Sequence, residues 1–172
     1  LAVSHVVLRK QDKLGMLTFS KDLEDWVVAE RRNSQMHLIS ESLYNIKTDF
    51  SESDFSKLYA VVKRKITHRS LLLLYTNFET MDGLKRQLPY LRALAKNHLL
   101  VIIFFKNTEL NTMITKGVRN VQEAYDTIIA EQFMFEKKQI VNELKKLGIQ
   151  AVLTKPENLT GETITKYLEL KA

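Results

Sequence analysis

The sequence contains no cysteine, and only two prolines and five glycines among its 172 residues. Without cysteine, the chain has no disulfide framework, no thiolate zinc site and no thiol nucleophile, which fits a reducing compartment. So few prolines and glycines leave no low-complexity linker to divide the chain, and no internal repeat is visible. We therefore expect residues 1–172 to form a single domain, long enough to bury a substantial core.

Several functional signatures are also missing. The chain has no glycine-rich phosphate-binding string and no G-x-S-x-G elbow of a serine hydrolase. Its longest apolar run, Leu99–Phe105, is much shorter than the roughly 20 residues that cross a bilayer. No signal peptide is visible, and the chain opens on Leu1 instead of methionine, so we expect a piece of a longer protein whose targeting segment could lie upstream.

The composition is basic, with a formal net charge of +6. The lysines and arginines form short clusters far apart in the sequence, whereas base-stacking modules interleave such clusters with aromatic residues. We therefore expect a solvated basic surface and no nucleic-acid partner, although nearby anionic lipid would explain the charge equally well. A basic nucleic-acid binder is a third alternative, and it predicts an affinity that falls steeply with salt.

The chain is organised around Ser70–Glu79, in which Leu71–Tyr75 has the composition of a strand buried on both faces. Two further buried strands are predicted at His98–Phe105 and Gln150–Thr154. Continuous apolar runs of this length, bounded by polar residues, are typical of the interior of a parallel sheet.

Amphipathic segments lie between these strands. The longest covers residues 121–147, and Gly148 is expected to stop that helix in the left-handed conformation. Ser51 and Asp54 have the spacing of a capping box for the helix that precedes the first buried strand. We therefore interpret Asp54 as a helix cap and not as a catalytic carboxylate.

Lys13–Phe19 and Asp25–Ala29 are separated by so short a link that they must form an antiparallel hairpin. The other strands are joined by helices long enough for right-handed crossovers. The predicted fold is therefore a doubly wound α/β domain of the Rossmann type. It has a mostly parallel sheet, helices on both faces and the hairpin at one edge.

Ligands of open α/β sheets collect beyond the carboxyl ends of the strands, which here points to Thr76, Asn77 and Glu79. Such oxygen-rich tips suit a hard divalent cation, but this one has few carboxylates. One alternative is a Mg²⁺-dependent phosphoesterase or nuclease that uses Asp22, Glu79 and Asp82. Glu79 and Asp82 could equally lie in the first turn of the following helix, where the dipole favours them.

The histidines do not form a metal site by spacing. None of the four is placed at the intervals typical of zinc ligands, and each lies near a predicted element boundary. We interpret them as surface or hydrogen-bonded residues: His5, His37, His68 and His98.

Four stretches resemble the von Willebrand factor A-like domain of the MoxR-associated bacterial proteins of unknown function. They are DKLGMLTFS, THRSLLLLYTNFE, HLLVIIF and the C-terminal LKKLGIQAVLTKPENLTGETITKYLELK, so the resemblance covers nearly the whole chain from about Asp12 onward. The last stretch is the most specific, with Gly148, Pro156 and a terminal Tyr-Leu-x-x-Lys at Tyr167 and Lys171.

The resemblance implies a metal-ion-dependent adhesion site at the carboxyl edge of the sheet. Its principal Asp-x-Ser-x-Ser motif follows the family's first strand, and this chain has no such string. A second contribution is a Thr-Asp pair after the Leu-rich strand. Here Thr76 is in place, but Asn77 stands where the acid belongs. The resemblance thus implies a degenerate metal site at Thr76 and Asn77, with Mg²⁺ as the cation that the full-length protein could hold.

In the family, the first strand lies mid-sheet, between the counterparts of Lys13–Phe19 and Leu71–Tyr75. We therefore expect a domain truncated at its N-terminus, with that strand supplied by a longer protein. The implied function is that of a non-enzymatic protein-interaction module that partners a MoxR-type AAA+ ATPase in protein assembly or remodelling. By the same resemblance, the chain is the cytoplasmic domain of a membrane-anchored protein of the bacterial inner membrane.

Overall fold

The computed structural model describes residues 1–21, 23–46, 52–108, 110, 114 and 120–171. They divide into two compact units. The hairpin unit comprises Leu1–Lys65 and Thr163–Ala172, and the sheet unit comprises Ile66–Glu162. Within the ranges described, no helix has both the length and the apolar composition needed to cross a bilayer.

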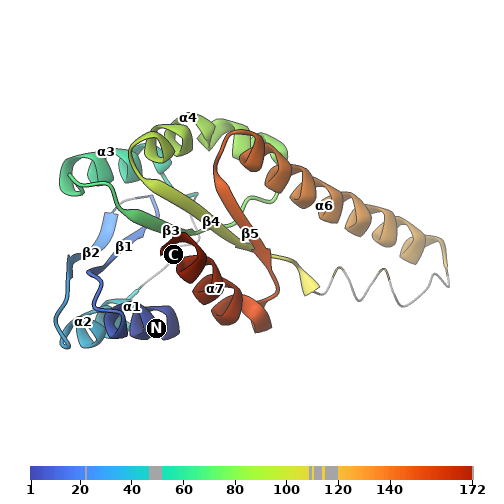
Figure 1. Ribbon diagram of the computed structural model, residues 1–172. Helices are drawn as coiled ribbons and strands as arrows, with labels where there is room; N and C mark the ends of the chain where they lie inside the picture. Colours follow the sequence, from blue (N-terminus) through green and yellow to red (C-terminus); the bar gives the residue numbers. More distant parts are fainter. Residues whose placement is uncertain (22, 47–51, 109, 111–113, 115–119, 172) are drawn as a thin grey trace. The chain divides into compact units, whose positions relative to one another are not determined.

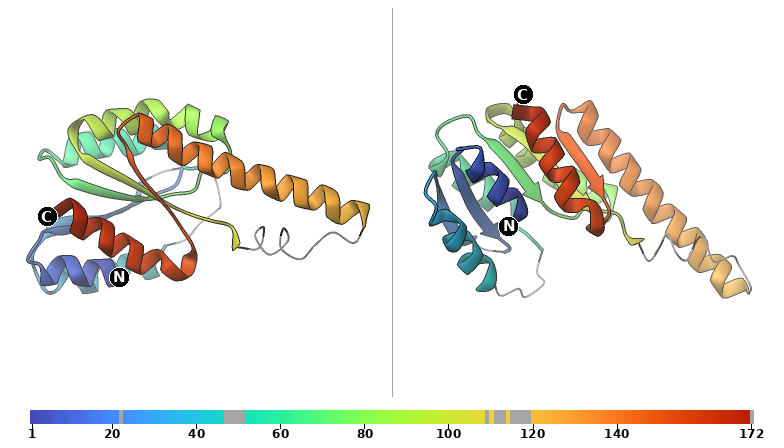
Figure 2. Two further views of the ribbon diagram at one scale, coloured as in Figure 1. Left: turned by 45° about the vertical axis from the view of Figure 1, so that its right-hand side comes forward. Right: turned by 60° about the horizontal axis from the view of Figure 1, so that its bottom comes forward.

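The sheet unit is built on three parallel strands, β3 (Leu71–Tyr75), β4 (Leu99–Phe105) and β5 (Gln150–Thr154), in the order β3-β4-β5. Helix α4 (Met81–Asn97) connects the first two strands, and α6 (Val121–Lys146) precedes the third. Both helices lie on one side of the sheet in Figures 1 and 2 and contact each other. The predicted parallel α/β arrangement of these segments is confirmed.

The core of this unit is the central strand and the helix faces above it. Residues Leu100–Phe104 are at most 3% exposed, because β4 has a neighbour on each side and α4 packs against it. The buried side chains of the two helices are Leu84, Leu91, Leu94, Ala130, Ile140 and Leu144.

Local chemistry explains where these helices begin and end. The Thr80 hydroxyl caps α4 by accepting from Gly83 N at 3.1 Å, and Asn120 Oδ1 caps α6 by accepting from Glu123 N at 2.8 Å. Gly148 has a φ of +74°, so the predicted left-handed stop of α6 is confirmed. After it come β5, the short η1 (Pro156–Asn158) and α7 (Leu159–Lys171).

The hairpin unit begins with α1 (Ala2–Arg9), followed by β1 (Leu14–Phe19) and β2 (Leu23–Glu30). The two strands pair antiparallel, which confirms the predicted hairpin. The expected position of this hairpin at an edge of the parallel sheet is wrong for the described residues. The two strands form a separate sheet that pairs with none of β3, β4 and β5. Two strands can satisfy each other's facing backbone groups, and their residue pattern does not specify a larger sheet to join.

Two helices complete the hairpin unit, α2 (Gln35–Tyr44) and α3 (Phe55–Lys65). The cap of α3 differs from the predicted box, because Asp54 immediately precedes the helix. Its Oδ1 accepts from Ser56 N at 2.9 Å and from Lys57 N at 3.0 Å. The predicted role of Asp54 as a helix cap is therefore confirmed, whereas its partner Ser51 lies outside the described residues.

Candidate lysine-lined site at the carboxyl edge of the parallel sheet

The carboxyl ends of the three parallel strands form an ordered edge. The ladder continues for one residue beyond β3 and β4, since Thr76 N donates to Ile103 O at 3.1 Å and Lys106 N donates to Thr154 O at 2.8 Å. The residues that follow these strands are therefore held in fixed positions beside one another. This is the edge at which ligands of open α/β sheets bind.

A hollow of about 670 Å³ lies at this edge. Residues from β4, β5 and α6 contribute to it, together with the segments that follow β3, β4 and β5. Phe133, Met134 and Leu153 provide apolar surface, and four lysines provide charge. We call this feature the lysine hollow, after Lys106, Lys137, Lys138 and Lys155.

Lys137 is the best positioned of the four. Its Nζ donates to Asn77 Oδ1 at 2.5 Å and to Phe105 O at 3.0 Å, and it lies 6.0 Å from the centre of the Phe104 ring. Burial lowers the pKa of the Lys137 ammonium, and the negative charge of Glu79 partly opposes that shift. The ammonium thus joins the tip of β3 to the end of β4.

The helical repeat of α6 places Lys137 on the side that faces the sheet. Ala130 and Leu144 lie seven residues before and after it, and both are fully buried. Residues seven apart are on the same side of a helix, so Lys137 occupies the inward face of α6. A lysine at the register of buried apolar positions is the local signal from which its inward position, though not its partner Asn77, could have been predicted.

The charges of the hollow favour anions. Among the residues that the structure describes, its lining carries four lysines and a single carboxylate, Glu79. Opposite charges attract and like charges repel over these short distances, most strongly where water is partly excluded. A carboxylate or phosphate oxygen is therefore a better match for this lining than a divalent cation.

The residues predicted to form a metal site have separate roles. The amide oxygen of Asn77 is bonded to the ammonium of Lys137. Asp82 lies in the first turn of α4, one of the two positions considered for it, and its carboxylate is 3.4 Å from Lys85 Nζ. Thr76 continues the ladder, and Asp22 lies outside the described residues.

This donor set does not fit Mg²⁺. The amide oxygen that would serve as a ligand already accepts from a cation, and the surrounding lysines repel a second one. Throughout the described ranges, no three His, Asp or Glu side chains are grouped closely enough to hold a metal ion. Among the histidines, His98 is buried, and its Nδ1 accepts from Ser70 N at 3.4 Å.

A second polar cluster lies in the hairpin unit. Asp12 Oδ2 accepts from Tyr167 Oη at 2.5 Å and from Lys171 Nζ at 2.6 Å. These bonds, first the one from Lys171 and then the one from Tyr167, lower the pKa of the Asp12 carboxyl. The cluster joins α7 to the turn between α1 and β1, so its geometry indicates a structural anchor. It contains the Tyr-Leu-x-x-Lys residues on which the resemblance partly rests.

No family model matches the chain, and no curated protein or solved structure matches it significantly.

Proposed function

We propose that this chain is a non-enzymatic protein-interaction module whose lysine hollow receives an acidic side chain of a partner. By resemblance, the partner is a MoxR-type AAA+ ATPase, and the module acts with it in assembling or remodelling other proteins. The same resemblance favours a von Willebrand factor A-like, doubly wound domain in the cytoplasm, belonging to an inner-membrane protein of a bacterium. The observation that carries the proposal is the Lys137 ammonium bonded to Asn77.

The bond gives the sheet edge a cation that belongs to the chain itself. An ammonium has three donors, and Asn77 and Phe105 accept from Lys137. A further donor can therefore bind an incoming carboxylate, beside the charges of Lys106, Lys138 and Lys155. The resemblance places a metal at this edge, and in our proposal Lys137 supplies the positive charge in its place.

The apolar part of the hollow adds specificity for a peptide. Phe133, Met134 and Leu153 line the same space as the lysines. A partner segment with an acidic residue next to an apolar one would satisfy both surfaces. Free inorganic anions would use only the charged part, so they are expected to bind more weakly than such a segment.

The alternative hydrolase mechanism is less well supported by the geometry. It requires Asp22, Glu79 and Asp82 to hold Mg²⁺ together. Glu79 lines the lysine hollow, whereas Asp82 is paired with Lys85 on the first turn of α4. Within the described lining of the hollow, Glu79 is the single carboxylate, and it is outnumbered by lysines.

The proposal is tested by co-purification of the full-length protein with the neighbouring ATPase, followed by affinity measurements on variants. We expect Lys137→Gln to weaken binding by about tenfold to a hundredfold, because a charged hydrogen bond contributes roughly 1.5–3 kcal/mol. Lys155→Glu is a second test at an exposed position of the same hollow. The matched control is Lys145→Glu, an exposed lysine in the last turn of the same helix, and it should leave the affinity unchanged.

Two further measurements separate the competing functions. A chelator should leave partner binding intact, and titration calorimetry with Mg²⁺ should show no heat assignable to the hollow. If the ATPase never co-purifies, or if chelation abolishes its binding, the proposal is wrong. Mg²⁺-dependent cleavage of a phosphodiester, lost in Glu79→Gln, would establish the hydrolase in its place.

A further inference from the structure

The N-terminal half of α6 exposes an apolar surface that the lysine hollow does not use. It runs past the carboxyl ends of the strands in Figures 1 and 2. Five large apolar side chains along it are 49–74% exposed. We call this surface the α6 stripe, and its members are Val121, Tyr125, Ile128, Ile129 and Phe135.

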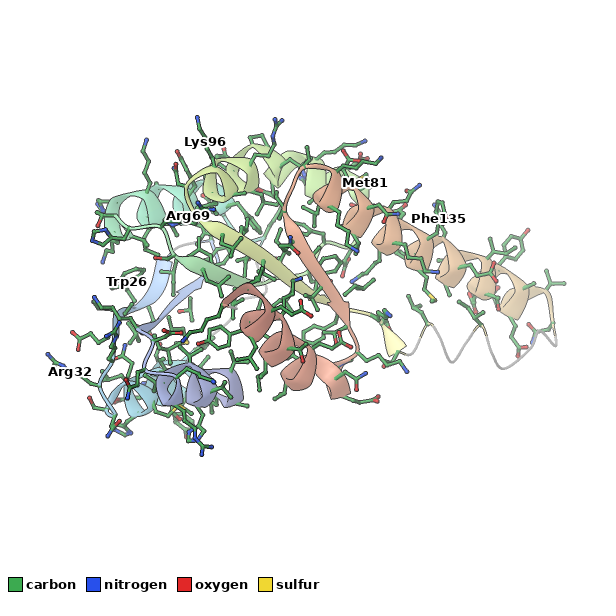
Figure 3. The ribbon with its side chains drawn as sticks, in the orientation of Figure 1. Trp26, Arg32, Arg69, Met81, Lys96 and Phe135 are labelled. Atoms are coloured by element: carbon green, nitrogen blue, oxygen red, sulfur yellow. The ribbon has the colours of Figure 1, made fainter. Side chains whose placement is uncertain are left out.

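The stripe has the spacing of a helix-packing surface. Val121, Tyr125 and Ile128 follow one another at intervals of four and three residues, and Phe135 lies one further heptad along. This is the repeat by which one helix packs against another. In Figure 3, Phe135 projects outward from α6.

The stripe is not the face by which α6 packs on its own unit. Ala130 is fully buried and lies nine residues after Val121, which at about 100° per residue places it on the opposite side of the helix. The C-terminal half of α6 buries Ile140 and Leu144 in the ordinary way. The same helix therefore packs its apolar residues inward at one end and exposes them at the other. Contiguous exposed apolar surface of this kind marks interaction sites.

Charge indicates which partner the stripe suits. Residues 121–136 contain four acidic residues and neither lysine nor arginine, although the whole chain carries a net charge of +6. A second copy of α6 would place these carboxylates against an identical set, which is repulsive. A helix with lysines or arginines beside its apolar face would pair with them. The four acids are Glu123, Asp126, Glu131 and Glu136.

We propose that the α6 stripe is a docking surface for a basic amphipathic helix of a protein partner. Apolar side chains of that helix, spaced by three and four residues, pack on Tyr125, Ile128 and Phe135. Its lysines or arginines lie beside Glu131 and Glu136. This interface is independent of the lysine hollow, which selects the opposite charge.

The test uses a synthetic helical peptide of roughly two to three heptads, with leucine at the apolar positions and lysine beside them. Its affinity for the chain is measured by fluorescence anisotropy. A counterpart with glutamate replacing each lysine is measured in parallel. We expect only the basic peptide to bind, and its affinity to fall with added salt. The positive net charge of the chain opposes this peptide, so binding requires a local acidic surface.

Two double variants locate the binding surface. Tyr125→Ser with Ile128→Ser should weaken binding by about tenfold or more, because central apolar contacts dominate interfaces of this kind. Glu131→Lys with Glu136→Lys should weaken it by several-fold and reduce the salt dependence. The control is Glu157→Lys with Glu162→Lys, an equal reversal of charge at exposed residues of η1 and α7, and it should change nothing.

Each of three outcomes would overturn the proposal. The basic peptide fails to bind the unmodified chain, or it binds all variants equally, or sedimentation shows a dimer that the Tyr125 and Ile128 substitutions dissociate. The last result would assign the stripe to a second copy. Circular dichroism of every variant verifies that the exposed substitutions leave the fold intact. Loss of ATPase binding in Lys137→Gln bears only on the lysine hollow, so the two proposals fail separately.

Discussion

The strands of the two units are stabilised by different means. In the sheet unit, the central strand is almost wholly buried, with residues Leu100–Phe104 at most 3% exposed. In the hairpin unit, no residue of β1 is buried, and Val28 of β2 is 56% exposed. The sheet unit thus obtains its stability mainly from apolar burial, at roughly 25 cal/mol for each Å² removed from water. The hairpin strands have far less of it.

Buried polar contacts compensate in the hairpin unit. Gln35 is 1% exposed, and its Nε2 donates to Leu14 O at 2.7 Å and to Val28 O at 2.5 Å, one carbonyl from each strand. The strands shift register next to Leu14, where a Cβ on Gly15 would lie only 2.8 Å from Val27 O. Ser42 Oγ also donates to Asp25 Oδ2 at 2.8 Å.

This difference between apolar burial and polar hydrogen bonding indicates which mutations should destabilise each set of strands. An apolar core loses stability in proportion to the volume removed from it. A polar anchor loses stability when one partner is left buried without a hydrogen bond. The strands of the sheet unit should therefore respond most to cavities, and the hairpin strands most to loss of a donor or acceptor.

The largest effect is expected from Ile102→Ala at the centre of β4. Ile102 is fully buried, and truncation leaves a cavity between its neighbours, so the free energy of unfolding should fall by about 4 kcal/mol. Urea denaturation followed by far-UV circular dichroism measures the loss. The similar truncation Val28→Ala, at an exposed position, should cost far less. Comparable losses in both would contradict the contrast between the units.

Gln35→Leu should cost roughly 2 kcal/mol, although it preserves volume and adds apolar surface. The change leaves the carbonyls of Leu14 and Val28 without the donor they have now, and the loss of each part-buried hydrogen bond is destabilising. Trp26 is the single tryptophan and lies in β2, so its fluorescence reports on this unit during denaturation. Gln139→Leu, at an exposed position of α6, is the control. Unchanged stability in Gln35→Leu would mean that the hairpin does not depend on this anchor.

A smaller effect is expected from pH in the sheet unit. Burial lowers the pKa of His98 from its ordinary value of 6.5, so the unfolded chain binds the proton more readily than the folded one. The stability of the sheet unit should therefore be greatest above that value and decline as the pH falls below it. Hydrogen exchange of the β4 amides over this range measures the decline. His98→Gln should remove it, and persistence of the decline in that variant would assign it to another group.

The smallest effect is expected at Asp12. The bonds from Lys171 and Tyr167 lower its pKa, so the stabilisation is present above the ordinary value of 3.8 and lost as the pH falls through the folded-state value. Asp12→Asn should cost less than about 1 kcal/mol, since both partners of the ion pair are more than a third exposed. Trp26 fluorescence in acid titrations measures this. A large loss near neutral pH would show that this anchor matters more than its exposure indicates.

Much of the secondary structure could be predicted because its causes are local. Continuous apolar runs identified β3, β4 and β5, and the short link between β1 and β2 required a hairpin. Gly148 marked the end of α6 because a left-handed residue is favourable for glycine. The candidate site was predicted only in part. Asn77 and Glu79 line it, but the importance of Lys137 was not recognised, because it lies 60 residues beyond Asn77.

Local patterns in the chain were thus sufficient for the positions of the strands, for the stop of α6 at Gly148 and for the parallel pairing that long crossovers impose. Tertiary structure alone decided three features. The hairpin forms its own sheet, the Lys137 ammonium donates a hydrogen bond to the Asn77 amide oxygen just beyond β3, and α6 exposes an apolar stripe. The physical reason is range. Periodicity and caps act within a few residues, whereas these three features depend on which distant groups meet, and no short stretch of sequence contains that information.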